Sequence, residues 1–483
     1  MVFSDRDIKN MTMDIKSLVR RAPVFYRILR ACYRRGSGRL LGDKIDDVAS
    51  RLARIERFLS SSPDLALGAG SISIVAQHAL AALREPKGDS SPALAVVSIL
   101  PPEKSGIAHF TFEAFSAAGY PVDFYSPRLN LASYLALCAR LEVEGKRHRV
   151  FPLDLLSYGL STLRYSACVF VLGNSEHNLP VYQAFKQLGR LAKHPIIHLH
   201  DPCLWNLVTA YKPSDSIEDV MRASYSDIPL SRGLIGIQEA LDLGALGTRC
   251  LLDGPKRPEI IVNSAAARQL LERELPGAPV RTVFHPIFTM SNYVRPVKGD
   301  KQGSLSIGAF GIPGPEKCTD LVLEAFREVR AILPEAKLIL AGYGAPAYVR
   351  TRNIGPEQGV FASEPEDTDS LVEIMASCDV AIQLRRRNLG ESSGIMAQLM
   401  SAEIPTVAFD IGAFQDYRGA VRLIPHSSRA KEIAQAVIEV QDTSSQAKAM
   451  AQLIVERSAS RFCQVFRDSV EDLTRAVPSL KTG

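Results

Sequence analysis

DVAIQLRRRNLGESSGIMAQLMSA, residues 379–402, is the stretch that decides the fold. Its first six residues form a short apolar run typical of a buried strand, and residues 395–402 have the apolar character of a helix that packs on a sheet. The loop between them is polar and contains Arg385 and Glu391. A strand, a polar loop and a helix in this order form the repeating unit of a parallel α/β sheet, whose ligands bind at the carboxyl ends of the strands.

The end of this loop is suited to a phosphate group. Ser392, Ser393 and Gly394 stand at the start of the predicted helix, where unpaired backbone N–H groups and the helix dipole attract an anion. Glu391 beside them can accept hydrogen bonds from sugar or ribose hydroxyls. The alternative is structural, with Ser392 capping the helix and Glu391 stabilising its positive end. The loop by itself leaves both interpretations open.

The same alternation of apolar runs and amphipathic stretches extends in both directions, in two series. Between the series, the chain up to residue 303 is polar, contains Pro296 and lacks periodicity, which predicts a linker at 288–303. We therefore expect an α/β protein with two Rossmann-like domains, 91–287 and 304–440, facing a cleft. The predicted strands are 94–100, 122–125, 167–172, 196–199, 259–262 and 281–284 in the first series, and 305–310, 337–341, 379–384, 406–409 and 421–424 in the second.

Two glycine-containing loops of the second domain are expected on the same edge as Arg385. Gly311 ends one strand and Lys317 follows it; glycine lets a pyrophosphate approach the backbone, and a lysine supplies compensating charge. The alternative for Lys317 is an ordinary exposed lysine. Gly342 follows the next strand, where a plain turn is the simpler interpretation.

Polar groups also follow three strands of the first domain, at what would be the acceptor side of the cleft. They are Ser105 with Gly106, Asn174 with His177, and His200 with Asp201. A lone histidine is more often a satisfied core residue than a functional one, whereas polar clusters at several strand ends favour a cleft.

Composition excludes several other classes of protein. The chain has 483 residues, 46% of them hydrophobic, and a net charge of +5, so no chain-wide field indicates nucleic acid. Its eight cysteines include no C-x-x-C pair, which argues against a zinc ribbon or a disulfide framework and favours the cytoplasm. The Asp367-Thr-Asp369 triplet has metal-binding spacing but precedes an apolar helix, so we expect a helix cap there and no metal site.

Residues 1–90 are expected to form a helical, basic N-terminal extension. The segment 16–44 contains nine Lys and Arg residues against one acid, Asp43, interleaved with apolar side chains. One interpretation is docking to an anionic membrane surface; the other is a solvated or partner-binding helix. Asp5, Arg6 and Asp7 stand where a signal peptide needs apolar residues, and 18 consecutive apolar residues occur nowhere in the sequence, so we expect neither export nor a membrane span.

Together and in this order, the motifs resemble those of the family 4 glycosyltransferases. The resemblance covers roughly residues 92–440 and rests on the following motifs: PEKSGIA at 102–108, Gly173 to Ser175 with His177, His200-Asp201, Val262 to Ser264, Gly311 with Lys317, and Leu384 to Gly394. It implies a GT-B fold, a nucleoside-diphosphate sugar as donor substrate, retention of anomeric configuration and no cofactor or obligatory metal. It also implies that residues 441–483 are helices that pack back across the domain interface.

By motif position, the resemblance assigns roles to individual residues. Catalytic roles fall to His200, Glu391 and Lys317; donor binding to Gly311, Lys317, Gly342, Arg385, Glu391, Ser392, Ser393 and Gly394; and the acceptor side of the cleft to Ser105, Gly106, Asn174, His177 and Asp201. The chain departs from the family pattern at Leu399, where many relatives carry a second Glu, and at Ile312 and Pro313, where many carry an Arg. Arg385 is the candidate for that missing cation.

The expected function is sugar transfer by a hexosyltransferase of polysaccharide biosynthesis. Its partners would be a nucleotide-sugar donor, a glycan or lipid-linked acceptor and an anionic membrane surface met by residues 16–44, with no nucleic acid. Its place would be the cytoplasm, on the inner face of the membrane. The alternatives are a glycosyltransferase-like subunit that binds without catalysing, and another GT-B enzyme such as a sugar-nucleotide epimerase.

Overall fold

The computed structural model describes Val75, Ala79 and residues 93–103, 105–143, 147–230, 236–253, 258–288, 305–440 and 444–476. Residues 72–141 and 145–483 form one compact unit. The predicted extension 1–90, including the basic segment 16–44, and the predicted linker 288–303 lie outside the described residues except at Val75, Ala79 and Phe288. The predicted domain boundaries therefore stay predictions.

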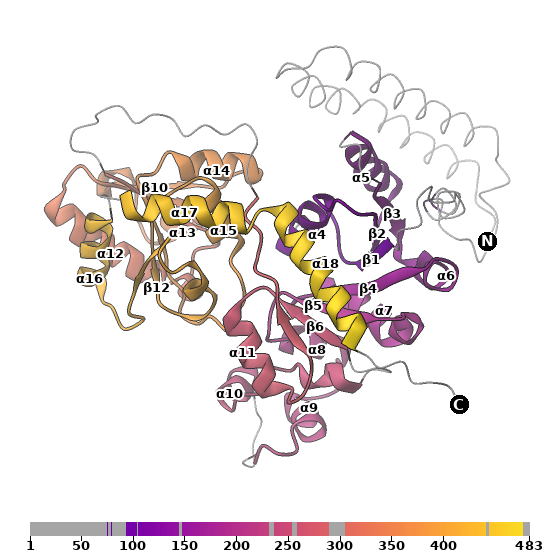
Figure 1. Ribbon diagram of the computed structural model, residues 1–483. Coiled ribbons are helices and arrows are strands. Elements are labelled where there is room, and N and C mark those ends of the chain that lie inside the picture. The colour runs from indigo at the N-terminus through magenta and orange to yellow at the C-terminus, as the bar shows by residue number, and fades with distance from the viewer. Residues whose placement is uncertain are drawn as a thin grey trace, which may run out of the picture. The chain divides into compact units, whose positions relative to one another are not determined.

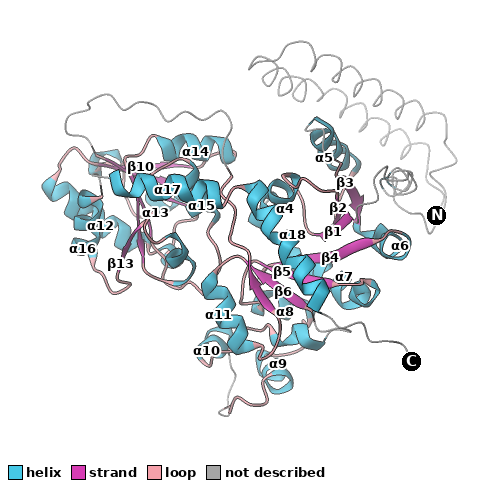
Figure 2. Cartoon of the chain, in the orientation of Figure 1, coloured by secondary structure: helices cyan, strands magenta, loops and turns pink. Residues whose placement is uncertain are grey.

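Two parallel β-sheets organise the described chain (Figures 1 and 2). The first has the order β3-β2-β1-β4-β5-β6-β7 and the second the order β10-β9-β8-β11-β12-β13. The first sheet comprises β1 (Ala93–Val97), β2 (Val122–Ser126), β3 (Arg149–Pro152), β4 (Tyr165–Leu172), β5 (Pro195–Leu199), β6 (Glu259–Val262) and β7 (Val280–Thr282). The second comprises β8 (Ser306–Phe310), β9 (Lys337–Ala341), β10 (Val360–Ser363), β11 (Val380–Gln383), β12 (Thr406–Phe409) and β13 (Arg422–Ile424).

Helices connect successive strands, as parallel pairing requires. Those of the first series are α4 (Gly106–Ser116), α5 (Leu131–Val143), α6 (Leu156–Thr162), α7 (Leu179–Leu188), α8 (Trp205–Tyr211), α9 (Ile217–Ser224), α10 (Ile237–Asp242) and α11 (Ala265–Glu274). Those of the second are α12 (Thr319–Ile332), α13 (Ala345–Thr351), α14 (Thr368–Ala376), α15 (Gly394–Ser401) and α16 (Ala430–Glu439). The predicted α/β fold with two Rossmann-like sheets is confirmed.

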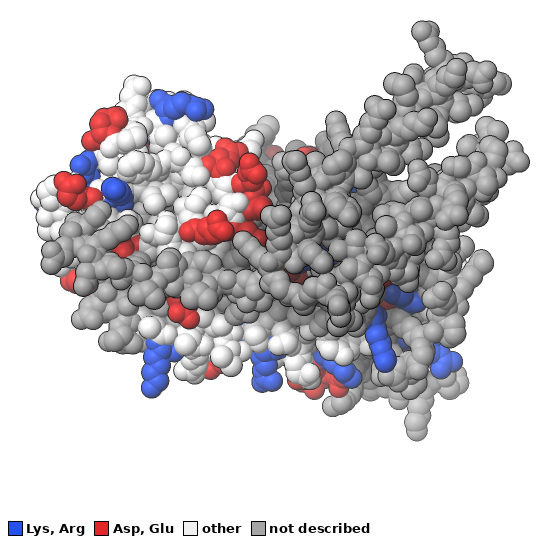
Figure 3. All heavy atoms as spheres, turned by 90° about the horizontal axis from the view of Figure 1, so that it is seen from above, with Lys and Arg blue, Asp and Glu red and all other residues white. Residues whose placement is uncertain are grey.

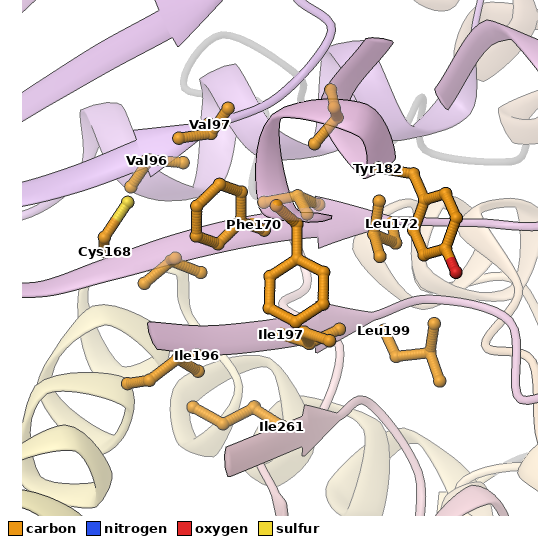
Figure 4. Close-up of a cluster of buried hydrophobic side chains, with 14 of the residues drawn as sticks. Val96, Val97, Cys168, Phe170, Leu172, Tyr182, Ile196, Ile197, Leu199 and Ile261 are labelled. Atoms are coloured by element: carbon orange, nitrogen blue, oxygen red, sulfur yellow. The ribbon is translucent and has the colours of Figure 1, made fainter. Parts of the chain in front are cut away.

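The core of the first sheet is built on its central strand, β4. Seven of the eight residues of β4 are buried, because helices cover both faces of a doubly wound sheet and leave no strand face in water. Figure 4 shows Phe170 and Leu172 of β4 among aliphatic side chains of β1, β5 and β6, including Val96, Ile197 and Ile261. The continuous apolar runs in the sequence reflect this double burial.

Both sheets gain an edge strand that the sequence pattern did not predict. They are β3 and β10, each four residues long. The pattern RVFP of β3 and the sequence VFAS of β10 are too short to establish a period, and an edge strand needs less apolar surface than a central one. Pairing with β2 and β9, which depends on the sheet as a whole, makes them strands.

The C-terminal helices connect the two sheets. Helix α17 (Ser444–Glu456) packs against α15, and α18 (Ala459–Ala476) packs against α4 (Figure 1). The Sγ of Cys463 on α18 donates to the Ala114 carbonyl oxygen over 2.9 Å, and the Tyr120 hydroxyl donates to the Cys463 carbonyl over 3.1 Å. One continuous C-terminal segment thus contacts elements of both series.

The described residues show the charge on one face of the molecule and the character of its helices. Acidic and basic side chains both appear on the face seen in Figure 3, and neither sign covers it. Among the described residues, no helix is both long enough and apolar enough to cross a membrane.

Candidate functional site

Several candidate residues follow the strands at which each sheet reverses its strand order. The first sheet switches direction between β1 and β4, and the second between β8 and β11. Loops after the two strands at such a switch point turn to opposite faces of the sheet, which opens a crevice beyond the strand ends. Gly311 and Lys317 follow β8 and Arg385 follows β11, while Ser105 follows β1 and Asn174 follows β4.

Gly311 and Gly342 bring the loops after β8 and β9 into direct contact. Gly311 has φ +104°, and a Cβ atom placed on it would lie 3.4 Å from the Lys317 Nζ. Gly342 has φ +156°, and a Cβ atom there would lie 2.3 Å from the Gly311 carbonyl oxygen. Gly342 therefore has no room for a side chain, and the positive φ of Gly311 disfavours one, which leaves backbone at the mouth of the sheet.

Lys317 lies at the end of a short 3₁₀ helix, Pro315–Lys317, and is half-buried. Burial, assisted by the charge of Arg385, lowers the pKa of its ammonium group to about 7, and Glu391 acts in the opposite direction. The loop is closed by the Gly314 N–H, which donates to the Thr319 hydroxyl over 2.9 Å. Lys317 lines a hollow at the strand ends together with Ala309, Phe310, Gly311, Pro313, Thr319, Val322, Leu340, Ile382, Gln383 and Leu384.

Arg385 connects this lysine electrostatically with two carboxylates. Its charge lowers the pKa of Lys317, and it also opposes the effect of burial, which raises the pKa of Asp201 and of Glu391. The Arg385 Nε is buried and has no hydrogen-bond partner within the described part of the chain. Two cations and two carboxylates from three loops therefore share one partly desolvated region.

The Glu391 carboxylate is held by its own loop. Its Oε2 accepts a hydrogen bond of 2.7 Å from the Leu389 N–H. Burial raises the pKa of this carboxyl, and the charge of Asp201 raises it as well. Asn388, which is buried, shapes the loop by accepting from the Gly390 N–H over 2.8 Å and from the Ala413 N–H over 3.1 Å.

Ser392 and Ser393, at the start of α15, make different hydrogen bonds. Ser393 is the N-cap, since its hydroxyl accepts from the Met396 N–H over 3.3 Å. The Ser392 hydroxyl donates instead to the Asn263 carbonyl over 3.1 Å, so the capping role considered for Ser392 belongs to Ser393. Gly394 is exposed, and nothing lies within 4 Å of a Cβ placed on it. The first turn of α15 thus faces open space where a phosphate could approach.

In the first sheet, the side chain of Asn174 is occupied by structural contacts. Its Oδ1 accepts from the Asn206 N–H over 2.8 Å, and its Nδ2 lies 3.6 Å from the Cys203 Sγ. The Asn174 N–H donates to Asp201 Oδ2 over 2.8 Å, which joins the loops after β4 and β5. Asn174 therefore shapes this edge of the sheet, and its amide has few hydrogen bonds left for a ligand.

Three other candidates on this side are more open. His177 is exposed, with its Nδ1 4.0 Å from Glu103 Oε2. Ser105 precedes α4 without a side-chain cap bond, and nothing lies within 4 Å of a Cβ placed on Gly106. A polar hollow is lined by Asn174, Ser175, Glu176, His177, Asn206, Thr209 and Ala210.

His200 belongs to a cluster of aromatic rings that the sequence did not predict. Its ring lies 4.2 Å from that of Phe110 and 4.8 Å from that of His198, and the His285 ring lies 4.8 Å from Phe110. Burial lowers the pKa of His198 to about 3, that of His285 to about 4 and that of His200 well below its usual value. These imidazoles are therefore neutral at physiological pH, and the Nε2 of His200 has no partner among the described residues.

Burial explains the departure at Leu399, and hydrogen bonding explains the Asp367-Thr-Asp369 triplet. Leu399 is fully buried in a core cluster of the second sheet, so this position presents no side chain to a ligand. Asp367 is the N-cap of α14, accepting from the Ser370 N–H over 2.8 Å, which confirms the predicted helix cap. No group of three or more His, Cys, Asp or Glu residues that could hold a metal ion occurs in the described ranges.

Similar proteins support the architecture. Residues 302–443 match the family model of the group 1 glycosyl transferases. HepE of Anabaena in complex with UDP-glucose has 13% identity and a TM-score of 0.51, with 79% of this chain and 100% of that chain covered. Its complex with UDP has 14% identity and a TM-score of 0.51, with 79% of this chain and 100% of that chain covered. Its complex with UDP and glucose has 15% identity and a TM-score of 0.50, with 78% of this chain and 99% of that chain covered. None of the curated proteins matches this chain in sequence.

The family match covers the loops that carry Lys317, Arg385 and Glu391, and the structural likeness spans both sheets. The family model thus confirms the resemblance identified from the sequence motifs over the second sheet, and the solved structures confirm the fold that it implies. The chain therefore has the GT-B fold, and its residues 302–443 match the family model of the group 1 glycosyl transferases.

Proposed function

We propose that the protein is a retaining glycosyltransferase that moves a sugar from a nucleoside-diphosphate sugar to a glycan or lipid-linked acceptor. The observation that carries the proposal is the meeting of Lys317, Arg385 and Glu391 at the switch point of the second sheet. The match to the group 1 glycosyl transferases supports it. HepE, which shares the fold, binds UDP-glucose in its solved complex, which makes a nucleotide sugar the natural donor to propose.

The donor diphosphate would lie between Lys317, Arg385 and the first turn of α15. As the bond between sugar and diphosphate breaks, negative charge develops on the leaving phosphate, and preorganised cations and N–H groups stabilise it. Lys317 and Arg385 are already partly desolvated, which strengthens their interaction with an anion. No obligatory metal is proposed, because these groups can supply the compensating positive charge.

Glu391 would accept hydrogen bonds from hydroxyls of the transferred sugar. In a retaining front-face substitution, the acceptor hydroxyl enters on the side from which the diphosphate leaves, and no protein base is required to begin. His200 would face the donor sugar as a neutral hydrogen-bonding group, in keeping with its lowered pKa. Ser105, Gly106 and His177, which lie open on the first sheet, would meet the acceptor.

The alternative with a specific observation behind it is a subunit that binds nucleotide sugars without transferring them. Leu399 stands where many family members have a second Glu, and it is buried, so ribose contacts must come from elsewhere. Donor binding with neither hydrolysis nor transfer over a panel of acceptors would favour this alternative. A sugar-nucleotide epimerase would instead convert the donor in the absence of any acceptor.

A donor screen tests the proposal first. A ligand that binds only the native state raises the melting temperature by mass action. We expect one of UDP-, GDP-, ADP- or dTDP-sugars to raise it, and that donor to support transfer with the anomeric configuration retained, as read by NMR of the product. No shift with any of these donors would contradict the proposal, and an inverted product would contradict retention.

Replacing Lys317 or Glu391 tests the site itself. We expect Lys317→Ala to lower turnover about 10²–10³-fold, as when one preorganised transition-state contact is lost, and to weaken donor binding. Glu391→Gln keeps the shape but loses charge-assisted acceptance, so its turnover should fall while its melting temperature stays near that of the wild type. Glu316→Gln, on an exposed neighbour of Lys317, is the control. Wild-type turnover in either site variant would show that the residue lies outside the site.

A cytoplasmic, peripheral membrane location is a further part of the proposal, and it rests on the basic segment 16–44 and a lipid-linked acceptor. Nine cations in 29 residues favour binding to anionic headgroups at low salt. Sedimentation with phosphatidylserine-containing vesicles should carry the protein down at low ionic strength and release it at high ionic strength. Equal, negligible binding to neutral and anionic vesicles would refute membrane docking and leave the transferase proposal untouched.

A further inference from the structure

A turn of the first sheet holds the loop of the second sheet that carries Glu391. The turn consists of Asn263 and Ser264, directly after β6. The Ser264 hydroxyl donates to the Gly390 carbonyl oxygen over 2.5 Å, and the Ser392 hydroxyl donates to the Asn263 carbonyl over 3.1 Å. These two hydrogen bonds bracket Glu391, one residue before it and one after it.

Ser264 performs two tasks with one hydroxyl group. While it donates to Gly390, its oxygen accepts from the Ala267 N–H over 3.0 Å as the N-cap of α11. The side chain is fully buried. A buried hydroxyl that donates and accepts at once has both its hydrogen-bonding functions satisfied and is held in a single orientation. Its orientation by α11 therefore sets the position of the Gly390 carbonyl.

The fit around this contact is close. Gly390 has φ +98°, and a Cβ atom there would lie 2.4 Å from the Ala267 nitrogen, so the loop rests directly on the first turn of α11. The side chain of Leu389 packs against the hydrophobic cluster of the first sheet. The N–H of this same Leu389 donates to the Glu391 carboxylate. The group that orients the carboxylate is thus anchored in the first sheet.

A second link holds the other side of the same contact. The Ala265 N–H, in the first turn of α11, donates to Asp416 Oδ2 over 3.3 Å. Asp416 belongs to the 3₁₀ segment Gly412–Tyr417, which also packs against α11. Asn388 joins this segment to the Glu391 loop through the Ala413 N–H. The loop is therefore supported from within its own sheet and from the other one.

We infer that Ser264 is a positioning residue for Glu391, which it holds through Gly390 and Leu389 in the orientation that meets the donor sugar. The inference rests on the proposed function, because it assigns to Ser264 a part in the same reaction. It also makes Glu391 dependent on contact between the sheets: the carboxylate is in place only while the turn after β6 touches the loop after β11. A displacement of about 1 Å in such a group costs up to about 10²-fold in rate.

The test compares Ser264→Ala with Ser216→Ala. Ser216 is the N-cap of α9 and takes no part in these contacts. Its replacement therefore removes a helix cap but leaves the site unchanged. We expect Ser264→Ala to lower kcat about tenfold with a much smaller change in the donor KM, and to speed backbone amide exchange in residues 388–392, as loss of one buried hydrogen bond predicts. Ser216→Ala should do neither. Equal behaviour of the two variants would overturn the inference.

A double-mutant cycle separates positioning from general structural damage. If Ser264 acts through Glu391, Ser264→Ala should cost little further activity in a Glu391→Gln background. Losses that simply multiply would overturn the inference. Should Ser264→Ala fail to fold, Leu389→Ala is the alternative variant, because it removes the side chain that packs against the first sheet. Unchanged kcat and unchanged amide exchange in Leu389→Ala would likewise overturn the inference.

The wild-type enzyme keeps the two proposals distinguishable. Absence of donor binding and transfer by the wild-type protein would refute the proposed function. Transfer by the wild-type protein together with an unaffected Ser264→Ala variant would refute only the positioning role.

Discussion

At the scale of single residues, the fold strongly changes the chemistry of Lys317. In an unfolded chain its ammonium would stay charged up to high pH, whereas burial in the hollow beside Gly311 lowers its pKa to about 7, helped by Arg385. Near neutral pH the lysine is therefore poised between its charged and neutral forms. A diphosphate would favour the charged form and so raise this pKa.

This predicts how donor binding responds to pH. Below pH 7 Lys317 already carries its proton, and above pH 7 binding must be accompanied by proton uptake. The donor affinity should therefore fall as the pH rises from 7 towards 9, by up to about tenfold per unit. Isothermal titration at several pH values, in buffers of different ionisation enthalpy, measures both the affinity and the protons taken up. A Lys317→Ala variant should lose this dependence, and a flat profile in the wild type would contradict the assignment.

At the scale of elements, the helix caps show how local sequence and site geometry differ. Asp367 caps α14, and Asp369 lies in its first turn without a side-chain cap bond. Ser393 caps α15 and Ser264 caps α11 in the same way, but both caps lie against the Glu391 loop. In all three helices the side chain of the N-cap residue accepts a hydrogen bond from a backbone N–H in the first turn. Only the surroundings of each cap show whether it stabilises the helix alone or also supports the site.

The prediction for α14 is therefore limited to stability. Asp367→Ala should destabilise the protein by about 1 kcal/mol, the usual cost of losing an N-cap, and leave transfer activity unchanged. Asp369→Ala, which loses only a charge near the helix dipole, should cost less. Thermal unfolding with and without Mn²⁺ is the measurement. A rise in melting temperature with Mn²⁺ in the wild type that both variants lose would identify a metal site at this triplet instead.

At the scale of the whole molecule, the C-terminal helices couple the two sheets. Phe466 of α18 is fully buried, 5.0 Å from the Phe115 ring of α4 and 5.4 Å from the His198 ring. Just before α18, the buried Arg457 donates to the Asp416 carbonyl over 2.6 Å, and its own carbonyl accepts from the Ile287 N–H over 2.7 Å. The hydrogen bonds of Arg457 thus connect α18, which packs on the first sheet, with the 3₁₀ segment Gly412–Tyr417 of the second series.

Loss of the Phe466 ring should weaken this coupling. Phe466→Ala removes a large buried side chain, at a cost of about 3–5 kcal/mol. We expect the wild type to unfold in one calorimetric transition and Phe466→Ala in two, because in the variant α18 would no longer hold the sheets together. Phe361→Ala, at an exposed position of the edge strand β10, is the matched control. A single transition at the wild-type temperature in Phe466→Ala would contradict the coupling.

The candidate site was predictable as far as its parts are local. Lys317, Arg385 and Glu391 each follow a strand with a recognisable apolar run, and parallel strands place their carboxyl ends on one edge. Asn174 also follows a strand, but its amide is engaged by Asn206 and Cys203, partners about 30 positions away in the chain. Sequence position alone cannot separate a side chain that faces a ligand from one that supports a neighbouring loop.

The sequence by itself determined which segments become strands, which residues begin helices and which loops carry charge, because these depend on residues within a few positions of one another. Only the tertiary structure decided the edge strands β3 and β10, the neutral imidazoles around Phe110 and the support of Glu391 by Ser264. Ser264 and Gly390 are 126 residues apart. Their hydrogen bond, like burial and the pKa shifts that follow from it, exists only once the two sheets have packed together.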